Sequence, residues 1–218
     1  MADITKRLTN IIASTDISIT VYRHGNTSKS WKVIMILEEL NLPYETEITD
    51  STQLKSEPYT SINPNGRLPA IKDPNTGLTL WESGAIIEYL VETYDKDHQI
   101  SFTPGSTEYF HAKQYLHFQM SGQGPYFGQA IWFRMFHPEK IASAEERILA
   151  GKEYLVGKFS YVDVPFVPWY GVVEGLFADE ADLGKDFPIV RAWLDRVQAR
   201  SAIAKVLKMR DEVAAAEN

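Results

Sequence analysis

The N-terminal part of the chain changes between the alternating pattern of strands and the apolar spacing of helices. Residues 17–22 alternate and are rich in β-branched side chains, which predicts a strand. After a polar loop over residues 24–29, apolar residues recur at helical spacing as far as Leu40, and Pro43 follows the expected helix end. Residues 44–48 form a second candidate strand, so this part of the chain predicts a β-α-β unit with parallel strands.

A hairpin and a second helix complete the pattern. Residues 67–72 and 78–81 are short candidate strands around a Pro-Asn-Thr-Gly turn. Ser83 is placed as the N-cap of a helix that ends near Tyr94. Together these segments predict a small α/β domain over residues 17–94.

The rest of the chain shows only helical spacing, which predicts an all-α domain over residues 107–215 behind a short linker. Two glycines and a proline loosen the middle of its long first segment, and Ser160 and Asp163 form a capping-box-like pair that opens a later helix. The expected helices cover about 107–136, 142–150, 188–197 and 202–215.

Composition and charge narrow the classes of function. The formal charge of -7 disfavours binding to nucleic acid or to an anionic membrane surface. No apolar stretch approaches the roughly 20 residues of a membrane helix, and residues 1–16 lack the apolar core of a signal peptide. We therefore expect a cytoplasmic protein without a membrane partner.

The residue types and motifs that the sequence lacks also limit the catalytic mechanisms open to the protein. The chain has no cysteine, which excludes disulfides and an enzyme thiol as nucleophile. None of its five histidines forms an H-E-x-x-H motif or an i,i+4 pair, so no metal site is expected.

Three local arrangements fit one ligand, beginning with Glu82 and Ser83. A serine hydroxyl at a helix start, together with free backbone N–H groups, makes an anion site, and the carboxylate before it can accept an ammonium group. This pair matches a free α-amino acid, such as the γ-glutamyl end of glutathione. An ordinary helix cap with a glutamate beside it has the same sequence.

The second arrangement is Leu68-Pro69, where a proline begins a strand after a glycine-containing turn. A cis bond there would offer the Leu68 backbone to a peptide-like ligand as an added strand, whereas an ordinary trans proline is the alternative. The third is the loop before the first helix, with the hydroxyls of Thr27 and Ser28 and the cation Lys29. These groups could stabilise a bound thiolate, or a serine there could serve only as the helix cap.

Longer motifs resemble one known family. N-P-N-G-R-L-P-A-I and W-E-S-G-A-I-I-E-Y-L resemble the thioredoxin-like domain of glutathione S-transferases, and Q-x-S-G-x-x-P, F-R-x-F-H and K-I-A-S-A-x-E-R look like fungal members related to the yeast prion-forming nitrogen regulator, which overlap bacterial nu-class enzymes. The resemblance covers roughly residues 17–208. It implies the glutathione S-transferase fold, glutathione as co-substrate, no metal, and a homodimer.

The resemblance also implies roles for particular residues. Leu68 would hold the cysteinyl backbone of glutathione beside a cis Pro69, Glu82 and Ser83 would hold the γ-glutamyl group, and Lys55 would reach the glycyl carboxylate. Relatives often have T-P-N-G-x-K-V around the thiol. Here Thr27 is kept and Lys29 stands in place of the asparagine, so the resemblance leaves Thr27, Ser28 and Lys29 as candidate thiol partners.

The implied activity is attack of the glutathione thiolate on a small electrophile, in detoxification or in fungal secondary metabolism. The electrophile would lie between the domains against Phe127 and Phe133. Arg134 either faces the same cleft or forms a salt bridge to a glutamate or aspartate. Glutathione-dependent disulfide reduction is an alternative, and a regulatory glutathione-binding protein without catalysis is another. Relative to this family, roughly twenty residues are missing between Arg147 and Gly157, so a shortened helix is expected after the long one.

Overall fold

The computed structural model describes residues 17–25, 28–135, 158–176, 182–186 and 188–216. The predicted helix over 142–150 and the predicted shortening before Gly157 lie outside these residues.

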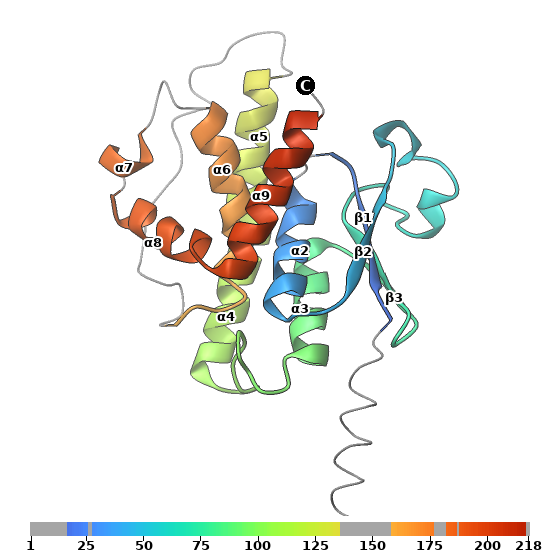
Figure 1. The fold of residues 1–218 in the computed structure, drawn as a ribbon, viewed down its shortest axis with the longest axis horizontal. Helices are drawn as coiled ribbons and strands as arrows, with labels where there is room; N and C mark the ends of the chain where they lie inside the picture. The colour runs from blue at the N-terminus through green and yellow to red at the C-terminus, as the bar shows by residue number, and fades with distance from the viewer. Residues whose placement is uncertain (1–16, 26–27, 136–157, 177–181, 187, 217–218) are drawn as a thin grey trace, which may run out of the picture.

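The N-terminal half is a four-stranded mixed sheet with two helices (Figure 1). The order of the strands is β2-β1-β3-β4, with β1 and β2 parallel and the other pairs antiparallel. This arrangement confirms the predicted β-α-β and β-β-α units. The strands are β1 (Ile19–Arg23), β2 (Tyr44–Ile48), β3 (Ala70–Asp73) and β4 (Leu78–Trp81), and the helices are α2 (Ser28–Glu39) and α3 (Ser83–Tyr94).

The helix α2 is buried on nearly all sides, because it lies between the sheet and the C-terminal helices. Its contacts include β1, α3, α6 and α9, and residues from Ser30 to Leu37 are buried without interruption. Arg200 at the start of α9 forms an ion pair with Glu39 at 2.7 Å. The two halves therefore share one apolar core, and α2 is held rigidly beside the space between them.

The C-terminal half is helical, as predicted (Figure 1). The long first segment is continuous, but a π-helical turn interrupts it at the predicted glycines, and α6 packs against α5. Its elements are α4 (Thr107–Phe118), the π turn (Gln119–Gln123), α5 (Gly124–Met135), α6 (Val167–Leu176), α7 (Leu183–Asp186), α8 (Pro188–Gln198) and α9 (Ser201–Ala216). No described helix is long and apolar enough to cross a membrane.

The Ser160–Asp163 pair sits in the core of the helical half. The Asp163 carboxylate accepts the Ser160 N–H at 2.9 Å and the Trp193 indole N–H at 3.0 Å, and it is fully buried. A short 3₁₀ turn, Val164–Phe166, then leads into α6. The predicted pair is thus present, and it ties the start of α6 to α8 through one carboxylate.

Candidate functional site

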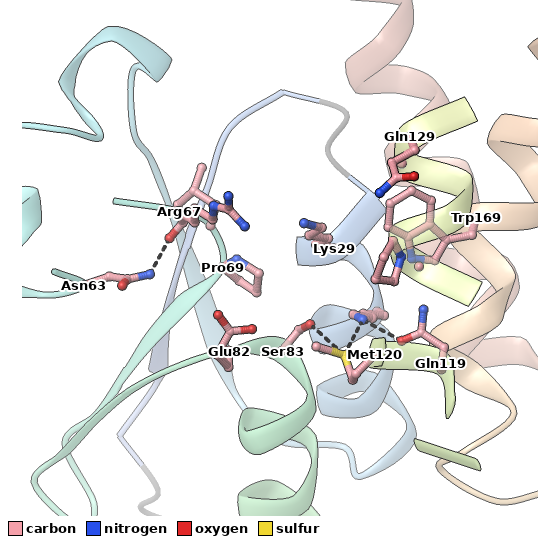
Figure 2. A pocket seen from close by; sticks show the side chains of 15 residues that line it. Lys29, Asn63, Arg67, Pro69, Glu82, Ser83, Gln119, Met120, Gln129 and Trp169 are labelled. Atoms are coloured by element: carbon pink, nitrogen blue, oxygen red, sulfur yellow. Dashed lines mark hydrogen bonds between the residues drawn. The ribbon is translucent and has the colours of Figure 1, made fainter. Parts of the chain in front are cut away.

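A cleft of about 550 Å³ lies between the sheet half and the helical half. It is lined from one side by the loop before β3 and the start of α3, and from the other by α5 and α6, while α2 and the π turn close its base (Figure 2). Its volume is within the usual range for a site that holds a small molecule.

Ser83 is the first residue of α3, so its prediction as the N-cap is wrong. Glu82 occupies the cap position, and the first helical hydrogen bond runs from the Ile86 N–H to the Glu82 carbonyl at 2.9 Å. The N–H groups of the three residues before Ile86 consequently have no acceptor within the helix. The Ser83 side chain lines the cleft, and its hydroxyl has the thioether of Met120 as a neighbour at 3.6 Å.

Glu82 lines the same cleft and adopts an unusual backbone conformation. Its φ is +69° and its ψ is 113°, outside the regions that non-glycine residues favour. Its carboxylate makes no capping bond to α3. Strained residues of this kind concentrate at ligand sites, where the surrounding structure holds them in place.

The Leu68-Pro69 bond is cis, as predicted, and both residues line the cleft. The loop before it is fixed through the Arg67 carbonyl, which accepts the Tyr59 hydroxyl at 2.8 Å and the Asn63 amide at 2.6 Å. Within the described residues, Leu68 makes no hydrogen bond. Its N–H and carbonyl are thus available to a ligand.

Lys29 reaches the cleft from the first turn of α2, which begins three residues earlier than the apolar pattern indicated. Burial and the neighbouring Arg67 lower the pKa of Lys29, and Glu82 opposes this effect. Thr27 lies outside the described residues, as does the side chain of Ser28. The choice among the three predicted thiol partners therefore stays a prediction.

Lys32, one turn after Lys29, was not predicted as a site residue. It is 1% exposed, lines the base of the cleft, and donates to the side-chain carbonyl of Gln119 at 2.8 Å and the sulfur of Met120 at 3.2 Å (Figure 2). Burial and the charge of Lys29 lower the pKa of Lys32 to about 7, against the opposing effect of Glu82. The spacing of three residues from Lys29 was the available signal, because it places both amines on one face of a helix.

Two other predicted site residues do not line the cleft. The Lys55 ammonium donates to the Asn65 carbonyl at 2.6 Å, on the turn before Arg67. The prediction that Phe127 faces the cleft is wrong, because its ring is 2% exposed and packs edge-on against Tyr170 in the core. The side chains of Phe133 and Arg134 lie outside the described residues.

The far wall of the cleft includes two glycines of α5 and the indole of Trp169, with Pro125 and Gln129 beside them. Gly124 and Gly128, one turn apart on α5, both face Trp169 of α6. A Cβ added at Gly128 would lie 3.7 Å from the Trp169 ring, and one at Gly124 would lie 3.0 Å from the Gln119 carbonyl. The absence of side chains here keeps the space beside the indole open.

The charge of the cleft differs from that of the whole chain. The cations Lys29, Lys32 and Arg67 line it together with one carboxylate, Glu82, whereas the chain carries a formal charge of -7. Among the described residues, no cluster of side chains suited to a metal is present. The cleft therefore favours an organic anion that also carries one positive group.

Comparisons with known proteins agree with this geometry. Family models for the N-terminal and C-terminal domains of glutathione S-transferases match residues 28–93 and 130–210. The glutathione S-transferase-like protein tpcF of Aspergillus fumigatus is 45% identical over 86% of this chain and 93% of its own.

Two solved structures from Phanerochaete chrysosporium have the same fold. Glutathione transferase URE2P6, in complex with oxidized glutathione, has a TM-score of 0.84 and 41% identity over 90% of this chain and 97% of its own. Ure2p5, cocrystallized with 1-(S-glutathionyl)-2,4-dinitrobenzene, has a TM-score of 0.82 and 35% identity. The match covers 94% of this chain and 100% of the Ure2p5 chain. The chain belongs to the glutathione S-transferase family.

Proposed function

We propose that the protein is a glutathione transferase that binds glutathione in the cleft and directs its thiolate at an electrophile. The arrangement at the start of α3 carries this proposal. Ser83 and the free N–H groups of the first helical turn receive the γ-glutamyl carboxylate, and Glu82 receives the ammonium group of the same residue. The unpaired backbone of Leu68 pairs with the cysteinyl residue.

The thiolate is placed at the N-terminal end of α2. The dipole of this helix and the positive charge of Lys29 both favour an anion, and Thr27 or Ser28 adds a hydroxyl donor. Lys55, which bonds the Asn65 carbonyl without ligand, has to swing away to meet the glycyl carboxylate.

The electrophile is placed between Trp169 and the two glycines of α5, Gly124 and Gly128. The open strip beside the indole accepts a flat group. The similar structure cocrystallized with a dinitrobenzene conjugate of glutathione supports an aryl electrophile as substrate. The reaction forms a carbon–sulfur bond as the thiolate attacks an aryl halide, and the halide leaves. Turnover of 1-chloro-2,4-dinitrobenzene with glutathione, followed by mass spectrometry of the adduct, tests the proposal.

Replacing Gly128 with leucine is expected to lower kcat/KM for the aryl halide about tenfold or more, because the added side chain fills the strip beside Trp169. The Kd for glutathione should change little, since Gly128 belongs to α5, whereas Ser83 belongs to α3 on the sheet side of the cleft. Steady-state kinetics and calorimetry measure the two effects separately. Gly175→Leu on α6, which has no neighbouring atom within 4 Å of an added Cβ, is the matched control. Equal losses in both variants would contradict the placement.

Glutathione-dependent disulfide reduction is the second candidate, supported by the neighbour bound to oxidized glutathione and by the cationic lining of the cleft. The glutathione thiolate attacks the glutathionyl sulfur of a mixed disulfide, oxidized glutathione forms, and the other thiol leaves. Turnover of a mixed disulfide without turnover of aryl halides would select this reaction.

A regulatory glutathione-binding protein without catalysis is the third candidate. It is favoured by Lys29, which stands where relatives often have the asparagine of the thiol-contacting motif. If Lys29 stabilises the thiolate, Lys29→Met should raise the pKa of the bound thiol by about 1. Titration of the thiolate ultraviolet absorbance measures this change. A wild-type complex that shows no thiolate near neutral pH would favour the regulatory role, and an unchanged titration in the variant would make Lys29 a bystander.

We further propose a cytoplasmic homodimer. Phe110 and Phe118 on α4 are 60% and 54% exposed, which is unusual for large apolar side chains and supports a partner surface on this helix. Light scattering during size-exclusion chromatography tests the dimer, and a monomeric mass at micromolar concentration would contradict it.

A further inference from the structure

Lys32 is buried in a setting that suits an uncharged amine. An ammonium group has three N–H donors, whereas a neutral amine has two. The described surroundings offer the amine two acceptors, the Gln119 carbonyl at 2.8 Å and the Met120 sulfur at 3.2 Å. Both acceptors are neutral, and no described carboxylate lies within ion-pair distance of the nitrogen.

Two charged groups act in opposite directions on the protonation of Lys32. Lys29 lies one turn earlier on α2 and opposes a positive charge, while Glu82 at the start of α3 favours one. The π turn contributes only Gln119 and Met120 to this space, and α6 contributes the indole of Trp169.

Carboxylates at the end of α2 and before α6 already have partners. Glu38 and Glu39 of α2 bind Lys205 of α9 and Arg200, the residue before α9. Asp163, before α6, bonds to Ser160 and to Trp193. Burial therefore decides the state of the amine, and an empty cleft leaves it about half protonated near pH 7.

A bound anion would change that balance. Met120 Sδ lies 3.6 Å from Ser83 Oγ and 3.2 Å from Lys32 Nζ, so the hydroxyl and the amine are within about 7 Å of each other. At such a distance inside a protein, one negative charge raises the proton affinity of an amine about tenfold or more.

We propose that Lys32 is a proton-linked countercharge for the ligand, and that its amine takes up a proton from solvent when an anionic glutathionyl group binds to the cleft. The proton comes from the buffer, the amine becomes an ammonium, and its third N–H then points to an anionic partner. This inference rests on the proposed glutathione site. The affinity for the anionic glutathionyl ligand then depends on pH. As pH rises above 7, binding has to take up a proton from a solution of lower proton concentration. The Kd therefore increases by up to about tenfold per pH unit.

The test is calorimetric titration with S-methylglutathione, which has no thiol to ionise. Titrations near pH 7 in buffers of different ionisation enthalpy give the number of protons taken up with the ligand. The wild type should take up about half a proton, because half of the amine is already protonated there. Lys32→Met, which keeps an unbranched chain of similar length, should take up close to none. Lys29→Arg, which keeps the positive charge beside Lys32 and does not titrate near pH 7, should retain the uptake.

The outcomes separate the two proposals. Binding without proton uptake in the wild type overturns the role of Lys32 and leaves the glutathione site intact, and this result needs no variant. Uptake that survives in Lys32→Met but is lost in Lys29→Arg also overturns the role of Lys32, and assigns the proton to Lys29. No detectable heat of binding in any buffer, with a Kd also absent by equilibrium dialysis, overturns the glutathione site itself.

Discussion

Alanine in place of Ser83 is expected to raise the Kd for glutathione about 10- to 100-fold. The hydroxyl is buried, lines the cleft, and has a weak thioether acceptor as its partner without ligand, so it is free to donate to a carboxylate. A hydrogen bond to a charged group contributes roughly 1.5–3 kcal/mol, and each 1.4 kcal/mol is a factor of about ten in Kd. Isothermal titration calorimetry with glutathione measures the change.

The matched control is Ser106→Ala. Ser106 caps α4 by accepting the Tyr109 N–H at 3.1 Å, outside the cleft. Its loss should lower the free energy of unfolding by about 1 kcal/mol and leave the Kd for glutathione nearly unchanged. If the two variants bind glutathione equally well, the carboxylate is not held at the start of α3.

Alanine in place of Asp163 is expected to lower the free energy of unfolding by about 3–5 kcal/mol. The carboxylate is fully buried, and its removal leaves the Ser160 N–H and the Trp193 indole N–H without an acceptor. Each buried unsatisfied donor costs about 1–3 kcal/mol, and the lost charge-assisted bonds are the stronger kind. Urea denaturation followed by tryptophan fluorescence measures the change.

Asp182→Ala is the comparison for this effect. Asp182 also bonds to a helix start, accepting the Gly184 N–H at 2.8 Å and the Lys185 N–H at 3.1 Å, but it is exposed. Water can replace these bonds, so we expect a loss of about 1 kcal/mol or less. Similar losses from both aspartates would show that Asp163 acts as an ordinary cap and does not join α6 to α8.

The regular part of the fold was predictable because local pattern and tertiary burial agree there. The alternation of residues 17–22 and the turn after Asp73 specify the first strand and the hairpin, and both are present. The Ser160–Asp163 pair was also predictable, since a cap depends on neighbours within three residues.

The base of the cleft was not predictable from local pattern. Lys32 lies in a run of apolar residues, and a lysine there indicates the solvent side of a helix unless a second layer covers it. The layer that covers it comes from Gln119 and Met120, almost ninety positions away in sequence, and pairing over that distance leaves no periodic signal. The positive φ of Glu82 was hidden for a similar reason, because a glutamate seldom adopts it without tertiary support.

The π turn at Gln119–Gln123 sets the rotation of α5 relative to α4, because a π turn contains one residue more than an α-helical turn. If evolution or an engineer removed one residue from it, α5 would turn by about 100° relative to α4. Gly128 would then take the core position of Phe127, and Gln129 would take the position of Gly128 beside Trp169. A single deletion in the π turn would thus place an amide side chain in the proposed electrophile pocket, and such indels offer a short route to new substrate ranges.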